Sequence, residues 1–288
     1  PFFIDAGPRD AGPVLFFVQG AGGHALQWVN QLYHFSGGHR CIAPDLRGHG
    51  LSDKPRRGYS IDGVTEDLVA VLDGLGIQEP VVLLAHSAGG LLGINFAARY
   101  PERLTKLVLI NSSANLPLSN WMRLGLRIPS VLMVVVRPFL QRKGRFNAPP
   151  HIFKQFVESS VGSWQGWDLL PDITTPTLVI AGQRDWYVRP SMSRRTAKEM
   201  PRARMEIIKA AWHKSPLERP EAVNRAIARF LETGLRSWRP RVEEARAVAQ
   251  RQPWLGHYEK GVPTEIVIPD QAVFHFLEES ARRWPDRP

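Results

Sequence analysis

The chain has 288 residues, of which 43% are hydrophobic and 22% charged, a balance typical of a globular protein with a sizeable core. It carries 37 Lys and Arg against 27 Asp and Glu, a net charge of +10, so composition alone leaves nucleic acid or an anionic membrane surface open as partners. The single cysteine, Cys41, excludes an internal disulfide framework and a multi-cysteine metal site.

The sequence predicts neither a membrane-spanning helix nor a signal peptide. Its most apolar run, residues 131–136, is far shorter than the roughly 20 residues that a spanning helix needs. The first residues, PFFIDAGPRD, begin like a strand and lack a basic segment followed by an apolar one, so we expect a cytoplasmic protein. Because the chain does not begin with Met, we also expect it to be part of a longer polypeptide.

Short apolar runs bounded by Gly, Pro and Asp predict buried strands. The runs are continuous rather than alternating, which is typical of a parallel sheet covered by helices on both faces. Helical patterns lie between them, for example in residues 61–76 and 88–104. This alternation predicts an α/β fold with a doubly wound, mostly parallel sheet. The predicted strands are residues 14–18, 41–44, 81–85, 106–110, 177–181 and 205–209.

The alternation breaks between Ser113 and Asp172. The pattern there is helical, is interrupted by prolines and contains no good strand, so it predicts a helical insertion between two strands of the sheet. The pattern changes again after Gly234, where residues 236–252 are typical of a charged linker helix.

The segment VVLLAHSAGGLLG, residues 81–93, carries the clearest chemical signal. A buried strand meets a turn and a helix follows at once, which is the context of a nucleophile elbow. Such a turn lifts Ser87 above the strand ends and needs small residues at Ala85 and Gly89, while the helix start directs its N–H groups at an oxyanion. A Ser/Gly-rich helix cap would explain the same residues.

A serine nucleophile needs a base, and the base needs an acid that orients it. Asp185 comes just after the apolar run TLVIA, and His213 lies in the loop after the next predicted strand. An acidic loop residue and a loop histidine are each common by themselves. Three such residues at strand ends together predict a catalytic triad of Ser87, Asp185 and His213.

Five motifs, in this order, resemble the α/β-hydrolase superfamily in its cap-bearing, serine-esterase-like branch, over residues 2–233. They are VQGAGGHALQW, APDLRGHGLSDKP, AHSAGG, AGQRDWYVRP and AWHKSPLERPEAV. The resemblance implies a hydrolase core formed by residues 1–112 and 173–233, with a helical cap over residues 113–172. It also implies a reaction that needs no metal and no organic cofactor.

The resemblance further assigns the oxyanion hole to the backbone N–H groups of Ala21 and Ala88. Two positions depart from the family pattern. Gln19 stands where the family usually has His, a change that backbone donors survive, and Trp212 stands where Gly often precedes the catalytic histidine. We expect Trp212 either to reshape access to His213 or to pack.

The motif DLRGHGLS, residues 45–52, is a family signature that we interpret as scaffold with no catalytic duty. Its physical basis is a tight turn held by Asp45 and Arg47. Serine rather than aspartate at position 87 disfavours haloalkane dehalogenase and epoxide hydrolase chemistry.

The implied activity is that of a carboxylesterase or lipase-like serine hydrolase of lipid metabolism, which cleaves esters of apolar acyl groups through an acyl-enzyme. The cap is apolar with basic flanks, which favours acyl groups over sugars or peptides, although its apolar side chains equally suit the cap's own core. The residues expected to line the substrate pocket are Trp28, Trp121, Leu124 and Val188.

The tail carries a second resemblance. The strings WLGHY, GVP and IP, followed by a helical segment, are similar to the opening of a long-chain acyl-CoA ligase of the adenylate-forming fold. This implies that residues 234–288 are a linker and the stub of a ligase domain in the parent polypeptide, without the ligase's nucleotide-binding loop. A generic helical extension would explain the same residues.

Several alternatives therefore stay open. The chain is an esterase, an acyl-thioesterase that supplies fatty acid to a fused acyl-CoA ligase, a cofactor-free perhydrolase or haloperoxidase, or a non-catalytic docking module of that ligase. The expected partner is a small-molecule ester or acyl thioester. No nucleic acid partner is expected, because the sequence contains no basic-aromatic module or recognition motif.

Overall fold

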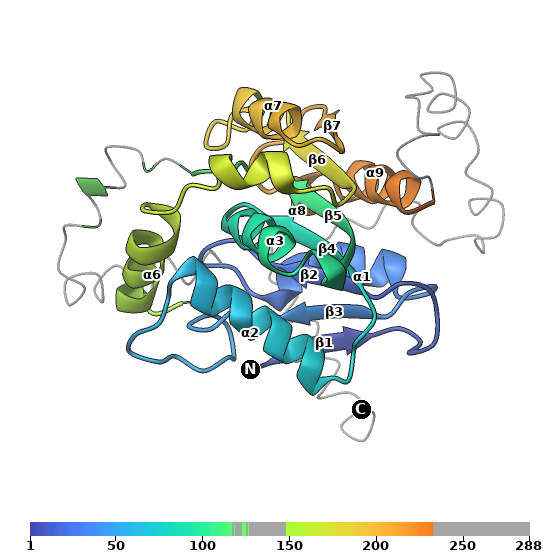
Figure 1. Cartoon of the computed structure of the whole chain (residues 1–288), viewed down its shortest axis with the longest axis horizontal. Helices are drawn as coiled ribbons and strands as arrows, with labels where there is room; N and C mark the ends of the chain where they lie inside the picture. The colour runs from blue at the N-terminus through green and yellow to red at the C-terminus, as the bar shows by residue number, and fades with distance from the viewer. Residues whose placement is uncertain (117, 119–122, 125, 127–147, 233–288) are drawn as a thin grey trace, which may run out of the picture. The chain divides into compact units, whose positions relative to one another are not determined.

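A seven-stranded sheet forms the centre of the computed structural model, which describes residues 1–116, 118, 123–124, 126 and 148–232. The strand order is β1-β3-β2-β4-β5-β6-β7 (Figure 1). β1 pairs antiparallel with β3, and all other neighbouring strands are parallel. The α/β fold with a mostly parallel, doubly wound sheet is thus confirmed.

The strands coincide with the continuous apolar runs of the sequence. Strands β2, β3, β4 and β6 are fully buried, because neighbouring strands and covering helices enclose them, whereas the edge strands β1 and β7 are partly exposed. The strands are β1 (Phe3–Ala6), β2 (Leu15–Val18), β3 (Cys41–Pro44), β4 (Val81–His86), β5 (Leu104–Ile110), β6 (Thr177–Gly182) and β7 (Ala203–Ile208).

Helices cover both faces of the sheet. The longest, α2, begins after Ser60, whose hydroxyl accepts a hydrogen bond from the Gly63 amide at 3.2 Å, as an N-cap should. The α-helices are α1 (Val29–Phe35), α2 (Ile61–Gly74), α3 (Ala88–Arg99), α6 (Pro150–Phe156), α7 (Pro190–Glu199), α8 (Ser215–Glu218) and α9 (Pro220–Glu232). Short turns are η1 (Ala25–Trp28), η2 (Pro101–Arg103), the π-helical η3 (Val157–Val161) and η4 (Trp167–Asp172).

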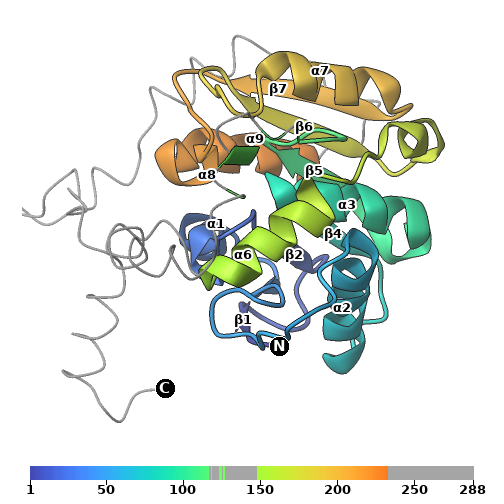
Figure 2. The ribbon, with the colours of Figure 1, turned by 90° about the vertical axis from the view of Figure 1, so that its left-hand side faces the viewer.

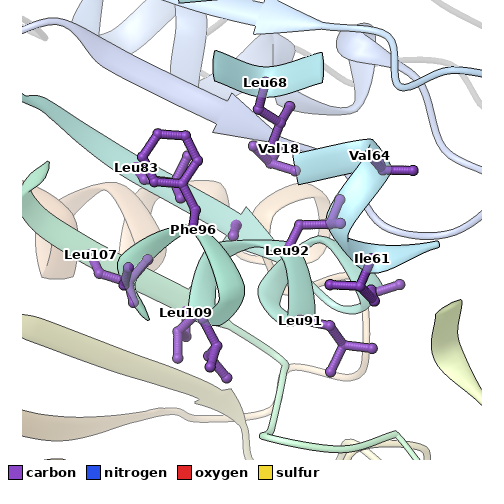
Figure 3. Close-up of a cluster of buried hydrophobic side chains, with 14 of the residues drawn as sticks. Val18, Ile61, Val64, Leu68, Leu83, Leu91, Leu92, Phe96, Leu107 and Leu109 are labelled. Atoms are coloured by element: carbon purple, nitrogen blue, oxygen red, sulfur yellow. The ribbon is translucent and has the colours of Figure 1, made fainter. Parts of the chain in front are cut away.

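Two apolar clusters lie on opposite faces of the sheet, because successive side chains of a strand alternate between faces. In β2, Phe16 and Val18 pack with α2 and α3, while Leu15 and Phe17 pack with α1 and α9. Figure 3 shows the first cluster, in which Phe96 of α3 lies among leucine side chains of the strands. Burial on both faces is the reason that the strands read as continuous apolar runs.

The parallel strands all end at one edge of the sheet, which faces the viewer in Figure 2. The loops that leave this edge are where ligands bind in open α/β sheets. Helix α6 lies in front of the edge (Figure 2). Within the predicted insertion, residues 113–172, the described part from α6 to η4 is helical and contains no strand.

Several sequence predictions lie outside the described residues: residues 127–147 of the predicted cap, Trp121, and the linker and ligase stub over residues 234–288. No helix in the described part of the chain is long and apolar enough to cross a membrane.

Candidate active site

A strained turn places Ser87 at the carboxyl edge of the sheet. β4 ends at His86, α3 begins at Ala88, and Ser87 between them has φ 53° and ψ −122°. A positive φ is uncommon for a residue with a side chain and persists only where the surroundings enforce it. Here the Ser87 amide donates to the Ile110 carbonyl at 2.9 Å, and the Ser87 carbonyl accepts from the Ser112 hydroxyl at 2.7 Å.

The predicted need for small residues around this turn has a direct structural cause. A Cβ atom added to Gly89 would lie 2.5 Å from the Gln19 carbonyl oxygen, so the start of α3 packs against the loop that follows β2. A Cβ atom added to Gly20 would lie 3.0 Å from Cβ of Ser87. The loop after β2 and the Ser87 turn are therefore in van der Waals contact.

The three residues predicted as a triad lie together in the structure. His213 Nε2 is 2.9 Å from Ser87 Oγ, and His213 Nδ1 is 2.8 Å from Asp185 Oδ2. The Asp185 side chain has no exposed surface, whereas the His213 side chain is 24% exposed. Because a carboxylate only accepts hydrogen bonds, the proton of neutral His213 is on Nδ1, which leaves Nε2 free to accept the Ser87 hydroxyl proton.

The environment of Asp185 favours its charged form. Burial of the carboxyl opposes ionisation, but the hydrogen bonds from His213 and Asn111 and from the Val188 amide outweigh it and lower the pKa of Asp185. Asn111 Nδ2 lies 2.8 Å from Oδ2, and the amides of Tyr187 and Val188 both lie 2.9 Å from Oδ1. Both carboxylate oxygens are thus occupied by donors.

The loop that carries His213 is fixed from two sides. His86 Nε2 donates to the His213 carbonyl at 2.8 Å, and the Tyr187 ring lies nearly perpendicular to the His213 imidazole with centroids 5.0 Å apart. Burial, followed by the charge of neighbouring His213, lowers the pKa of His86 to about 3, so His86 is neutral. Trp212 does not pack in the core: the residue is 48% exposed, and its amide donates to Glu218 Oε2 at 2.6 Å.

The predicted oxyanion donors lie on the two segments that meet at Ser87. Within the described residues, neither the Ala21 amide nor the Ala88 amide donates a hydrogen bond to the protein. The loop around Ala21 is closed by the Gly23 amide, which donates to the Gly20 carbonyl at 3.1 Å. Gln19, which replaces the family's histidine, ties the same loop by donating from Nε2 to the Gly23 carbonyl at 3.0 Å.

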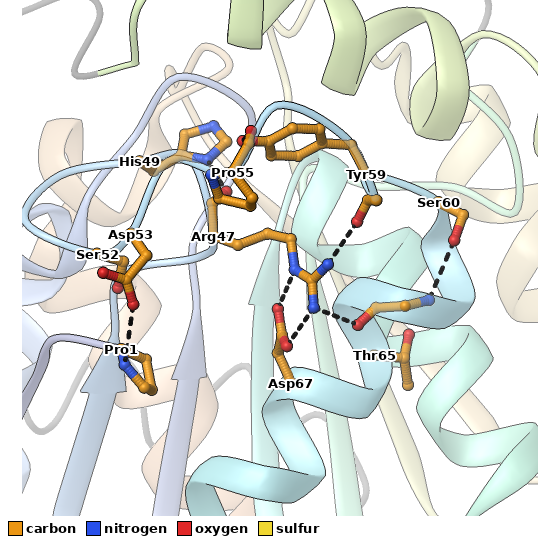
Figure 4. Close-up of polar contacts among 12 residues, drawn as sticks. Pro1, Arg47, His49, Ser52, Asp53, Pro55, Tyr59, Ser60, Thr65 and Asp67 are labelled. Atoms are coloured by element: carbon orange, nitrogen blue, oxygen red, sulfur yellow. Dashed lines mark hydrogen bonds and ion pairs between the residues drawn. The ribbon is translucent and has the colours of Figure 1, made fainter.

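The Asp45 side chain closes the turn of the DLRGHGLS motif, whereas the Arg47 side chain points away from it. Asp45 Oδ2 accepts from the Leu51 amide at 2.7 Å, which closes the turn. Arg47 instead reaches out of the turn, donating from Nε and Nη2 to the Asp67 carboxylate of α2 and from Nη1 to the Gly58 carbonyl at 2.7 Å (Figure 4). The Arg47 side chain therefore anchors the motif to α2, because its long planar group reaches Asp67.

Of the residues expected to line a substrate pocket, the structure describes Trp28, Leu124 and Val188. Trp28 has no exposed area and packs on Phe17, with ring centroids 5.3 Å apart. Val188 is also fully buried, with its side chain in the core and its amide on Asp185. Both side chains are therefore packed in the apolar core in this structure. Leu124 is 53% exposed.

Two residues of the site, Asn111 and His86, were not predicted from the sequence. Asn111 follows β5 at the same edge of the sheet as the other site residues, and its φ of 49° is one that Asn tolerates better than most residues. An asparagine directly after a buried strand was the available signal. His86 was visible only as part of the elbow motif, because its partner is a carbonyl 127 residues away in sequence.

Two family models match the chain. One, described as "alpha/beta hydrolase fold", covers residues 13–144, and one described as "TAP-like protein" covers residues 161–239. Among curated relatives, Epoxide hydrolase 1 of Caenorhabditis elegans is 40% identical over 111 residues, which are 38% of this chain and 27% of that protein. 3-Oxoadipate enol-lactonase 2 of Acinetobacter baylyi is 28% identical over 75% of this chain and 87% of its own length.

The chain thus spans only a minor part of some relatives, including 42% of the cis-3-alkyl-4-alkyloxetan-2-one decarboxylase of Shewanella oneidensis, to which it is 35% identical over 132 residues. Solved structures match over more of the chain. An enol-lactonase from Burkholderia xenovorans has a TM-score of 0.71 at 24% identity, covering 81% of this chain and 96% of that one. A thermophilic esterase from Thermogutta terrifontis has a TM-score of 0.69 at 26% identity, covering 80% and 92%. The chain therefore has the α/β-hydrolase fold.

Proposed function

We propose that the protein is a serine hydrolase that cleaves carboxylic esters of apolar acyl groups through an acyl-enzyme. The observation that carries this proposal is the continuous hydrogen-bond relay from Ser87 Oγ through His213 to Asp185, at 2.9 and 2.8 Å. A relay of this kind activates a hydroxyl that is otherwise a weak nucleophile.

In the proposed reaction, His213 Nε2 takes the Ser87 hydroxyl proton as Oγ attacks the ester carbonyl carbon. The imidazolium that forms is stabilised by the buried carboxylate of Asp185, which the surrounding donors keep charged. His213 then gives the proton to the departing alkoxide, and the acyl group remains on Ser87 Oγ. Water, deprotonated by the same imidazole, attacks the acyl-enzyme and releases the carboxylic acid.

The negative charge that develops on the carbonyl oxygen needs donors that are already in place. We assign this role to the Ala88 N–H, at the N-terminus of α3, and to the Ala21 N–H. Both amides are without a hydrogen-bond acceptor in the described part of the chain. Donors of this kind contribute about 10²-fold to 10³-fold each in the rate of acyl transfer.

The relatives support an ester substrate in particular. The enol-lactonase of Acinetobacter baylyi and the esterase of Thermogutta terrifontis both bear names that denote the opening of ester bonds, and a lactone is a cyclic ester. The similarity to an epoxide hydrolase covers only 111 residues. An acyl thioester would be attacked by the same residues, so acyl-CoA substrates belong in the same assay. The proposal of a fused ligase rests on the tail sequence alone.

The test is covalent labelling by a fluorophosphonate together with turnover of p-nitrophenyl esters of increasing acyl length. Ser87→Ala is expected to abolish labelling and to lower kcat by at least about 10³-fold while the protein stays folded. Ser113→Ala is the matched control, because among the described residues the Ser113 hydroxyl bonds only to Thr196 Oγ1, at 3.1 Å. Near wild-type turnover by the Ser87 variant would contradict the proposal.

A further inference from the structure

The DLRGHGLS turn lies directly against the loop that carries Ala21. The Gly22 amide donates to His49 Nε2 at 3.0 Å, and the Ala25 amide donates to Asp45 Oδ1 at 2.6 Å, so the turn holds this loop at two points. The first of these bonds is buried, and His49 has no exposed surface. Figure 4 shows His49 in the same turn as Arg47 and Ser52.

The partners of His49 fix its tautomer. Nδ1 lies 3.0 Å from the Arg47 carbonyl oxygen, which only accepts hydrogen bonds, so Nδ1 carries the proton and Nε2 offers a lone pair to Gly22. The Phe156 ring, from α6, packs nearly perpendicular to the imidazole with centroids 5.2 Å apart. Burial lowers the pKa of His49, with Lys54 acting in the same direction, and outweighs the opposing effects of the Arg47 carbonyl and of Asp45.

The direction of the Ala21 N–H depends on two neighbouring peptide planes. In the plane before Ala21, the Gly20 carbonyl accepts from the Gly23 amide at 3.1 Å, and because a trans peptide is planar, the Ala21 N–H points away from Gly23. In the plane after Ala21, the Gly22 N–H is held by His49. Gly22 has φ 72° and no side chain to restrict it, so without His49 this second plane loses its side-chain anchor.

We propose that His49 is a positioning residue for the oxyanion hole: its neutral Nε2 holds the Gly22 amide and thereby fixes the Ala21 N–H beside Ser87. This role rests on the proposed function, since it matters only if a charge develops on a substrate oxygen there. The proposal gives a role in catalysis to the DLRGHGLS motif, which we interpreted from the sequence as purely structural. This role requires the hydrogen-bond acceptor Nε2 of His49 and does not depend on the size of its ring.

The test compares three variants in ester turnover and in urea unfolding. His49→Phe keeps a ring against Phe156 but removes the acceptor, so we expect kcat to fall about 10-fold to 100-fold with KM within about twofold. His49→Gln carries an amide oxygen at about the reach of Nε2 and is expected to recover most of that loss. Tyr59→Phe is the control: it removes the hydroxyl that donates to the Pro55 carbonyl at 2.6 Å and makes no bond to the Ala21 loop, so it should change stability and not kcat.

Hydrogen exchange of the Gly22 amide gives a readout that does not depend on activity. We expect faster exchange in His49→Phe and wild-type exchange in Tyr59→Phe. A wild-type protein that neither reacts with fluorophosphonate nor turns over esters would overturn the proposed function, and with it this role. An active wild type with unchanged kcat in His49→Phe would overturn the role of His49 alone. If His49→Phe fails to fold, His49→Gln still decides, because faster Gly22 exchange with unchanged kcat in that variant contradicts the proposal.

Discussion

Replacement of Asn111 by Asp should make the free energy of unfolding fall as the pH rises. In the native protein, ionisation of Asp185 has the opposite effect. In the native protein, Asn111 Nδ2 donates to Asp185 Oδ2 at 2.8 Å and to the Trp212 carbonyl at 3.2 Å. The pKa of Asp185 is lowered by its donors in spite of burial, so its ionisation stabilises the fold above the ordinary carboxyl range. That stabilisation is lost as the pH falls through the lowered pKa. Asn111→Asp puts a second carboxyl against the first and raises the pKa of the pair.

The magnitude follows from what the substitution removes and adds. A hydrogen bond to a charged group contributes about 1.5–3 kcal/mol. Two unit charges about 4 Å apart, at an effective dielectric constant of about 20, repel by about 4 kcal/mol, which proton uptake partly relieves. We therefore expect Asn111→Asp to lower the free energy of unfolding by about 4–6 kcal/mol at pH 8 and by about 2–3 kcal/mol at pH 5. The raised carboxyl pKa makes the variant lose stability as the pH rises.

Urea unfolding at a series of pH values measures this difference. Asn111→Gly is the control, because glycine accepts the φ of 49° and removes the donor without adding a charge. It should lose about 2–3 kcal/mol with a much smaller dependence on pH. Equal pH slopes for Asn111→Asp and the wild type would refute the argument, because they would mean that the Asn111 side chain does not face the Asp185 carboxylate.

Two further predictions concern parts of the fold that support the site. Arg47→Lys should lower the free energy of unfolding by about 1 kcal/mol, because an ammonium cannot reproduce the two hydrogen bonds to Asp67 and the one to Gly58. A double-mutant cycle with Asp67→Asn checks this, and a coupling energy near zero would contradict it. Phe96→Ala should cost about 3–5 kcal/mol in the same measurement, because Phe96 is fully buried in α3 against the strands (Figure 3). A loss below about 1 kcal/mol for Phe96→Ala would show that this part of the core collapses around the missing ring.

The sequence predicted the sheet well because its strands are buried on both faces. A short run such as VVLLA favours a central strand, since neither an exposed strand nor an amphipathic helix would be apolar at every position. The elbow at Ser87 was predictable for a related reason. A strand, a sharp turn and a helix follow one another in the chain, so they produce a recognisable pattern in contiguous residues. Asp185 and His213 could be found because they follow strands that end at the same edge.

Contacts between segments far apart in sequence were not predictable in this way. Nothing local to His49 indicates that its ring meets Gly22, 27 residues earlier. Likewise, Trp28 has the chemistry of a pocket residue, and only the packing of η1 against Phe17 shows that it belongs to the core. Amphipathic side chains of this kind are ambiguous until their neighbours are known.

The bond from His86 to the His213 carbonyl has a consequence for how tolerant the chain is to change. It ties the base to the residue next to the nucleophile, although 127 positions separate them. The distance between Ser87 and His213 is therefore set locally, at the end of β4, and does not depend on the length of the chain between them. Insertions into the segment before β6, or a circular permutation with new termini there, should leave the distance between Ser87 and His213 unchanged as long as His86 is kept.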